Sequence, residues 1–104
     1  MCGIWGYVGN TKNEVNLFNA YNNVRPRGPE RSEFLQWNEF VNFYIGFHRL
    51  AIMENHLLGD QPFLHETEEK RIVLCCNGEI YNYKELIEEH DLRVASHSDC
   101  EVIL

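Results

Sequence analysis

The stretch Cys2-Gly3-Ile4-Trp5-Gly6-Tyr7-Val8-Gly9 decides the fold, because it combines a cysteine directly behind Met1 with a strand-forming run. β-branched and aromatic residues favour strands, and glycines within a strand mark places where another group approaches the backbone. Trimming of Met1 would give Cys2 both a thiol and an α-amine that can take the thiol proton near neutral pH. The stretch predicts a nucleophile carrying its own base; the alternative is a small apolar residue that opens a strand.

Composition and charge narrow the class of protein. A chain of 104 residues with 44% hydrophobic content can bury one core but hardly two. The net charge of −7, with acidic runs at residues 66–69 and 85–91, argues against a nucleic-acid partner. No apolar run approaches the roughly 20 residues that span a bilayer, and no signal peptide is visible. We therefore expect a cytoplasmic protein with no membrane partner.

The 4 cysteines are expected to be reduced thiols in such a compartment. Cys75 and Cys76 are adjacent, so in a strand their side chains point to opposite faces and cannot chelate one metal ion together. We interpret both as buried structural thiols and predict no metal site. The histidines show no ligand spacing, and we expect four of them to be surface or loop residues: His48, His56, His65 and His90.

Hydrophobic spacing predicts a helix in the first part of the chain. Asn13 can cap a helix over residues 14–24, whose apolar residues share one face that packs on a sheet. These residues are Val15, Leu17, Phe18, Tyr21 and Val24. Pro26 and Pro29 then fix a turn.

Strand patterns follow this turn. Residues 40–47 alternate as in a strand with one buried face, made by Val41, Phe43, Ile45 and Phe47. Strand character resumes over residues 48–53, and the apolar run 71–76 predicts another strand ending at Asn77-Gly78.

Two helix starts are predicted near the carboxyl end. Asn82 resembles the cap of a short helix over residues 84–89. Ser98 and Glu101 have the spacing of a capping box. Starting a helix is costly and is repaid only by further turns, so we expect the chain to be a fragment that ends within an element.

The motifs MCGIWG, RPRGPE, FHRLAI, NGEIYNY and SDCEVIL occur in this order and resemble the glutaminase domain of glutamine-hydrolysing asparagine synthetases. That family belongs to the class II glutamine amidotransferases, which are N-terminal-nucleophile hydrolases. The resemblance implies an α+β fold with αββα layers, incomplete in this chain, and one partial type 2 glutamine amidotransferase domain over residues 1–104. One departure follows the RPRGP motif, where Glu30-Arg31-Ser32-Glu33 replaces the usual aspartate, serine and glycine.

The resemblance implies that Cys2 attacks the side-chain amide of glutamine and releases ammonia and glutamate through a thioester. Asn77 and Gly78 would form the oxyanion hole, although Asn-Gly after a strand is also a common hairpin turn. Arg49 would bind the substrate α-carboxylate through its planar fork, and Glu79 and Asp99 would face the α-ammonium. The backbone after the arginine would line the pocket through Leu50, Ala51, Ile52 and Met53.

No metal or organic cofactor is expected for this half reaction. The resemblance places ATP and magnesium in a synthetase domain, present in cis or in trans, where ammonia would convert aspartate to asparagine; a homodimer is also compatible. Other hypotheses are a silent glutamine-binding or partner-pairing domain and a glutaminase domain of another class II amidotransferase. A nucleophilic Cys100 with His97 and Asp99 is disfavoured, because catalytic partners seldom lie so close in sequence.

Overall fold

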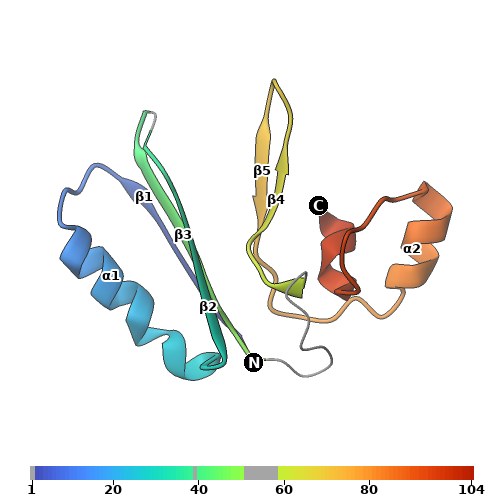
Figure 1. Cartoon of the computed structure of the whole chain (residues 1–104), viewed down its shortest axis with the longest axis horizontal. Helices are drawn as coiled ribbons and strands as arrows, with labels where there is room; N and C mark the ends of the chain where they lie inside the picture. Colours follow the sequence, from blue (N-terminus) through green and yellow to red (C-terminus); the bar gives the residue numbers. More distant parts are fainter. Residues whose placement is uncertain (1, 39, 51–58) are drawn as a thin grey trace.

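The computed structural model describes residues 2–38, 40–50 and 59–104, and these form a mixed arrangement of strands and helices (Figure 1). This confirms the α+β class. The elements in chain order are β1 (Gly3–Gly9), α1 (Glu14–Asn23), the 3-10 helix η1 (Arg25–Arg27), β2 (Arg31–Trp37), β3 (Asn42–Arg49), β4 (Phe63–Glu66), β5 (Arg71–Leu74), α2 (Tyr83–His90) and the 3-10 helix η3 (Asp99–Ile103).

The first sheet has the order β1-β3-β2, and both outer strands run antiparallel to β3. The register places Trp5 and Phe34 on either side of Gly46. Because Gly46 has no side chain, the Tyr21 ring of α1 lies over it; a Cβ there would be 2.3 Å from Tyr21 Cε2. The Tyr21 ring centroid is also 5.2 Å from that of Phe34 and 6.0 Å from that of Trp5. This aromatic cluster fixes α1 on one face of the sheet.

The helix α1 begins where the sequence predicts. The Asn13 side chain accepts a hydrogen bond from Asn16 N–H at 3.1 Å, which satisfies a donor of the first turn. Leu17 is buried together with the tyrosine of the aromatic cluster, so the expected packing on a sheet is confirmed. Val15 and Phe18 lie on the margin of the contact and are 70% and 56% exposed.

The central strand β3 corrects the prediction for residues 40–47 and 48–53. One unbroken strand runs from Asn42 to Arg49, and residues 51–53 lie outside the described part. On the expected buried face only Phe47 is buried, at 2% exposure, while Val41 is 43% exposed. The opposite face is the better buried one. That face carries Tyr44, Gly46 and His48 under α1. The helix thus covers the face of β3 that the alternation did not predict to be buried.

His48 is fully buried, so its assignment to the surface was wrong. Its Nε2 lies 2.9 Å from the Tyr21 carbonyl oxygen, and its Nδ1 lies 2.7 Å from Ser32 Oγ. A carbonyl only accepts, so Nε2 carries the proton and Nδ1 accepts from the serine hydroxyl. His65 and His90 are exposed as predicted, whereas His56 lies outside the described residues.

The second sheet is the hairpin of β4 and β5, preceded by a turn that ties its two ends together. The Gln61 side chain is buried, accepts from Cys76 N–H and donates to the Cys76 carbonyl oxygen at 3.1 Å. The strand ends at Leu74, two residues earlier than predicted. Cys75 and Cys76 are therefore half-buried residues of the following segment rather than buried strand residues.

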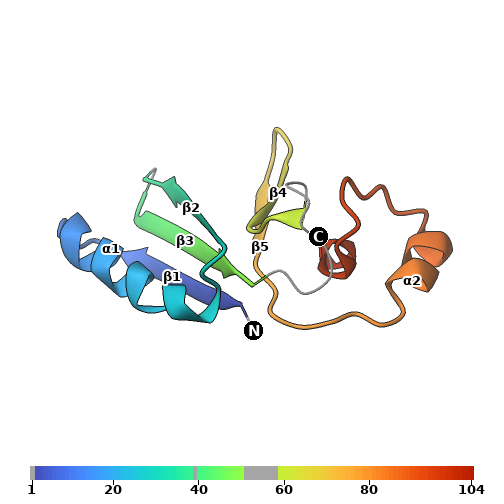
Figure 2. The same ribbon diagram turned by 60° about the horizontal axis from the view of Figure 1, so that its bottom comes forward.

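Beyond the hairpin, the chain crosses to α2 and returns to η3 (Figure 2). The short helix is confirmed, but Asn82 makes no side-chain capping bond. The predicted capping box is wrong, because the Glu101 carboxylate accepts from the N–H groups of Ala95 and Ser96, at 2.7 Å each, and from the Ser96 hydroxyl. Those donors hold the carboxylate away from the backbone of Ser98.

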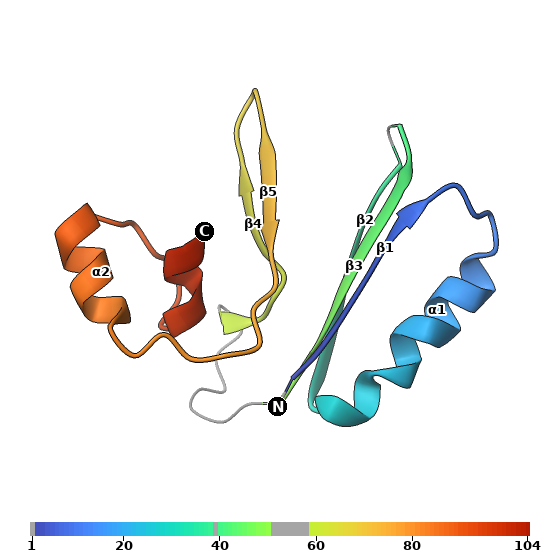
Figure 3. The same cartoon turned by 180° about the vertical axis from the view of Figure 1, so that it is seen from behind.

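The elements follow one another across the molecule as helix α1, the first sheet, the β4–β5 hairpin, and then η3 with α2 (Figures 1 and 3). The hairpin lies on the side of the first sheet away from α1. Within the described residues, none of the helices is long and apolar enough to cross a membrane. The cytoplasmic location stays a prediction.

Candidate functional site

Cys2 sits just before β1, where three contacts fix its backbone and sulfur. Leu50 N–H donates to Cys2 Sγ at 3.3 Å, and the thiol lies 3.7 Å from the Leu50 carbonyl oxygen. The Cys2 carbonyl oxygen accepts from Arg27 Nε at 3.2 Å. The next residue, Gly3, lies close to the Val24 carbonyl oxygen. A Cβ at Gly3 would be only 2.7 Å from that oxygen, so a side chain would not fit there. Glycine at this position thus packs the start of β1 against the end of α1.

Asn77 meets Cys2 from a segment 75 residues away in sequence. Its Oδ1 accepts from Cys2 N–H at 3.2 Å. The Asn-Gly pair is no hairpin turn: β5 pairs only with β4 in the described part of the chain, and the residues after Gly78 lead to α2. With Oδ1 directed at the nitrogen of Cys2, the amide NH₂ group of Asn77 is the end that can donate to a ligand.

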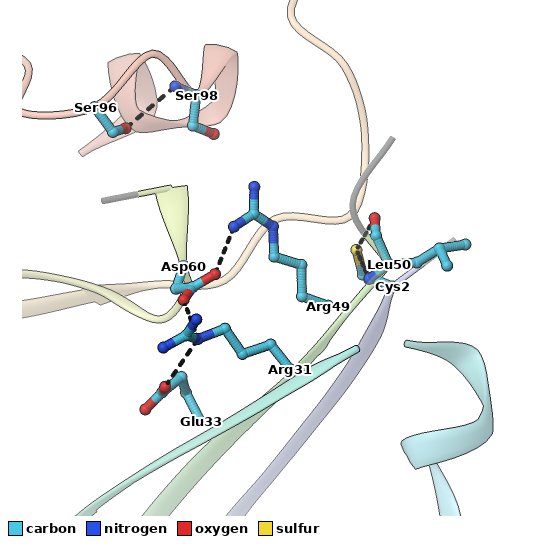
Figure 4. A network of polar contacts seen from close by, with 8 residues as sticks. All are labelled: Cys2, Arg31, Glu33, Arg49, Leu50, Asp60, Ser96 and Ser98. Carbon is cyan, nitrogen blue, oxygen red and sulfur yellow. Dashed lines mark hydrogen bonds and ion pairs between the residues drawn. The ribbon is translucent and has the colours of Figure 1, made fainter. Parts of the chain in front are cut away.

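Arg49 ends β3 one residue before the backbone that holds the cysteine sulfur (Figure 4). Its Nη1 lies 2.6 Å from Asp60 Oδ1, and its side chain is 14% exposed. The other Asp60 oxygen pairs with Arg31 Nε. The arginine predicted to bind a carboxylate is therefore held in an ion-pair network close to Cys2.

The remaining predicted residues lie on the segment that follows Asn77. Gly78 is exposed, and its carbonyl oxygen lies 3.4 Å from Cys100 Sγ. Asp99 Oδ2 accepts from Ile80 N–H, which joins η3 to this segment. Glu79 is exposed and forms no hydrogen bond or ion pair with another described residue. Ala51, Ile52 and Met53 lie outside the described residues.

The other thiols differ from Cys2 in their surroundings. Burial raises the pKa of Cys75 and of Cys100 to about 12, with neighbouring charges adding to the effect. Thiols with raised pKa values stay protonated and are poor nucleophiles near neutral pH. This disfavours Cys100 as an alternative nucleophile. The cysteines are all free in the structure, and the reduced compartment stays a prediction.

Sequence reasoning missed Asp60 and Gln61, which support the site from the turn before β4. Asp60 holds Arg49, and Gln61 fixes the backbone of Cys76, the residue before Asn77. In the sequence, Gly59 and Pro62 flank these two residues and indicate a loop, but they give no hint of the partners of Asp60 and Gln61. Among the described residues, no group of three His, Cys, Asp or Glu side chains is placed to hold a metal ion.

Comparison with known proteins identifies the family of the chain. A family model described as the glutamine amidotransferase domain matches residues 1–104. The asparagine synthetase (glutamine-hydrolyzing) of Gallus gallus is 39% identical over 105 residues, covering 100% of this chain and 18% of that protein. A probable asparagine synthetase (glutamine-hydrolyzing) of Acanthamoeba polyphaga mimivirus is 35% identical over 109 residues, covering 100% of this chain and 19% of that protein.

The Homo sapiens asparagine synthetase (glutamine-hydrolyzing) is 35% identical over 105 residues, with 100% of this chain and 18% of that protein covered. The chain thus spans about a fifth of the length of these relatives.

Proposed function

The chain belongs to the glutamine amidotransferase domain family, and from this membership we propose that it hydrolyses glutamine to glutamate and ammonia with Cys2 as nucleophile. The proposal rests mainly on one observation: two segments that are distant from Cys2 in sequence contact this residue. Asn77 Oδ1 lies 3.2 Å from its nitrogen, and Leu50 N–H lies 3.3 Å from its sulfur. These contacts support the proposal, because Cys2 meets Asn77 on one side and the residue that follows Arg49 on the other.

The first step needs Met1 to be removed, because a peptide nitrogen is not a base. The freed Cys2 amine takes the thiol proton, and the sulfur attacks the side-chain carbonyl carbon of glutamine. The electrons of the carbonyl bond move to its oxygen, which Asn77 Nδ2 and Gly78 N–H stabilise. Each such donor is typically worth about 2.7 to 4 kcal/mol in the transition state.

The tetrahedral intermediate collapses when the Cys2 ammonium returns its proton to the leaving nitrogen. Ammonia departs, and the acyl group stays on the sulfur as a thioester. A water molecule then gives one proton to the amine and attacks the thioester carbon, which releases glutamate and restores the thiol. Atoms and charges balance without an external cofactor for this half reaction.

Recognition of glutamine is proposed to divide between two parts of the chain. Arg49 binds the α-carboxylate by two parallel hydrogen bonds, and the Leu50 backbone lines the same pocket. Asp99 and Glu79 face the α-ammonium. Asp99 is supported by its link to the Ile80 backbone, beside the proposed oxyanion hole.

For the whole protein, we propose the N-terminal glutaminase part of an asparagine synthetase with αββα layers. The succession of α1, the first sheet, the hairpin and α2 supports this layering. The ammonia would pass to a synthetase domain, in cis or in trans, that uses ATP and magnesium to convert aspartate to asparagine. The names of the relatives support this assignment.

The test combines intact mass with ammonia release. We expect the purified chain to lack Met1 and to release ammonia from glutamine, and we expect Cys2→Ala to abolish release. Cys75→Ser is the matched control, since this thiol lies outside the site, and it should retain activity. Glutamine binding without ammonia release in the unmodified chain would favour the silent-domain alternative instead.

A further inference from the structure

Two arginines face each other at the end of the first sheet. Arg31 on β2 is directly opposite Arg49 on β3 in the antiparallel register. Side chains opposite one another in such a pair are about 5 Å apart at Cβ, and like charges there destabilise the sheet. Asp60 offsets this repulsion, because its Oδ1 binds Arg49 Nη1 at 2.6 Å while its Oδ2 pairs with Arg31 Nε (Figure 4).

We propose that Asp60 is a positioning residue for glutamine recognition: it bridges Arg31 and Arg49 and holds the Arg49 guanidinium ready for the substrate α-carboxylate. This inference rests on the proposed function of Arg49. Asp60 contacts the guanidinium at Nη1, and this charge-assisted contact fixes the guanidinium beside the turn before β4. Asp60 thus acts through Arg49, not on the substrate.

The charge balance of the network explains why a second arginine is present. Asp60 alone would neutralise Arg49 and weaken its attraction for a carboxylate. Adding Arg31 leaves one net positive charge on the three groups. Glu33 approaches Arg31 only at 3.8 Å with both side chains about half exposed, so solvent screens that contact.

The turn that carries Asp60 is fixed on both sides. Gly59 packs against the guanidinium, since a Cβ built there would lie 3.4 Å from Arg49 Nη2. Gln61 bonds both backbone groups of Cys76. The same turn therefore sets the position of Arg49 and of the segment that leads to the proposed oxyanion hole.

The Arg31 side of the network faces water. It borders a groove of about 220 Å³ lined by Arg31, Glu33, Leu35, Asp60, Gln61 and Pro62. The Asp60 and Arg49 side chains are only 10% and 14% exposed, whereas Arg31 is 46% exposed. We therefore expect salt to weaken the Arg31 contribution more than the Asp60–Arg49 pair.

The experiment measures glutamine affinity by calorimetry in a Cys2→Ala chain, where binding is separated from hydrolysis. Asp60→Asn should weaken glutamine binding about tenfold, as expected for loss of a charge-assisted hydrogen bond that orients the ligand-binding group. Asp60→Glu, which keeps the carboxylate, should retain most of the affinity. Glu33→Gln is the matched control, because Glu33 touches Arg31 but not Arg49. The glutamine affinity of this variant should stay within about twofold of the affinity of the Cys2→Ala chain.

A double variant separates positioning from simple charge neutralisation. Asp60→Asn alone should also lower the melting temperature, because the two arginines then repel each other. Adding Arg31→Gln removes that repulsion, so the melting temperature should recover while glutamine affinity stays weak. Recovery of both quantities would overturn the positioning role.

A glutamine analogue with an amide in place of the α-carboxylate sharpens the test. Its affinity should be the same with Asp60 or Asn at position 60, because it lacks the group that Arg49 binds. Equal losses for analogue and glutamine would contradict the inference. If the Cys2→Ala chain binds no glutamine, the inference and the substrate assignment both fall. If binding follows the prediction but the unmodified chain releases no ammonia, only the proposed hydrolysis fails.

Discussion

The two described parts of the chain on either side of residues 51–58 differ in how much they bury. The part before this segment contains a sheet with a helix packed on it, and four of its hydrophobic residues are buried: Leu17, Tyr21, Tyr44 and Phe47. In the part that follows, the buried hydrophobic residues among those described are Phe63 and Cys100, and α2 contributes none. Backbone and side-chain hydrogen bonds carry more of the organisation there, as at Gln61 and Glu101.

The residues of the candidate site therefore come from two parts of the chain that differ in how many hydrophobic residues they bury. Arg49 ends β3 and Cys2 lies just before β1, whereas Asn77 and Asp99 belong to the thinly packed part. Local stability follows buried apolar contact, so the segment that carries Asn77 and Asp99 should open more readily than the start of β1 beside Cys2. Binding of glutamine is then expected to stabilise the second part more than the first.

The largest expected effect comes from the aromatic cluster. Tyr21→Ala removes the ring that packs on Gly46 and Phe34, and should lower the free energy of unfolding by about 3 to 5 kcal/mol. Ile87→Ala on α2 is the comparison in the second part, with an expected cost near 1 kcal/mol. Urea denaturation of both variants measures the difference, and equal losses would show that the two parts are packed alike.

The next effect tests the close approach at Gly46. Gly46→Ala places a methyl group 2.3 Å from Tyr21 Cε2, so the helix must shift, at a cost of about 1 to 3 kcal/mol. Gly6→Ala is a matched control on β1, where the added Cβ would lie 3.7 Å from the Tyr44 carbonyl oxygen. Thermal unfolding should separate the variants clearly. Similar melting temperatures would mean that the helix does not press on this glycine.

A smaller effect is expected from the carboxylate that holds the chain before η3. Glu101→Gln keeps one acceptor but loses the charge that strengthens its bonds to Ala95 and Ser96, so about 1 kcal/mol of stability should be lost. Glu88→Gln on the exposed side of α2 should change stability by less than about 0.5 kcal/mol. Amide hydrogen exchange at the two donors gives a local readout, and unchanged protection would refute the role of Glu101.

The last effect appears only at alkaline pH. The pKa of Cys75 and of Cys100 is about 12 in the folded chain, above the ordinary value of 9.0. Their contribution to stability is therefore complete below pH 9 and is lost as pH rises toward 12. Replacing Cys100 with alanine should flatten the decline between pH 9 and 12 relative to the unmodified chain. A decline of the same slope in both would exclude this linkage.

Sequence reasoning succeeded where the signal was local. The cap at Asn13 and the helical spacing after it predicted α1, because capping and periodicity involve neighbouring residues. The strands β2 and β4 were not predicted, since they are short or mostly polar and gain stability from pairing with distant partners. His48 was assigned to the surface because its partners, Ser32 and Tyr21, come from other elements.

The site shows the same limit. Resemblance to a family named Cys2, Arg49 and Asn77, and the structure places Cys2 beside Asn77 and next to the end of β3. The resemblance gave no information on Asp60 or Gln61, because the roles of these two residues depend on where the turn before β4 lies. The capping-box prediction was wrong because the Glu101 carboxylate accepts hydrogen bonds from Ala95 and Ser96, which lie outside the motif. Long-range competition of this kind cannot be read from spacing alone.

The most direct test of Cys2 as an N-terminal nucleophile uses a glutamine analogue with an electrophilic carbon at the side-chain amide position. Peptide mapping by mass spectrometry then locates the adduct, with the other three thiols as internal controls. We expect one adduct, on Cys2 of chains that lack Met1, and we expect excess glutamine to prevent its formation. Labelling of Cys75, Cys76 or Cys100 in preference to Cys2, or labelling that glutamine does not prevent, would contradict it.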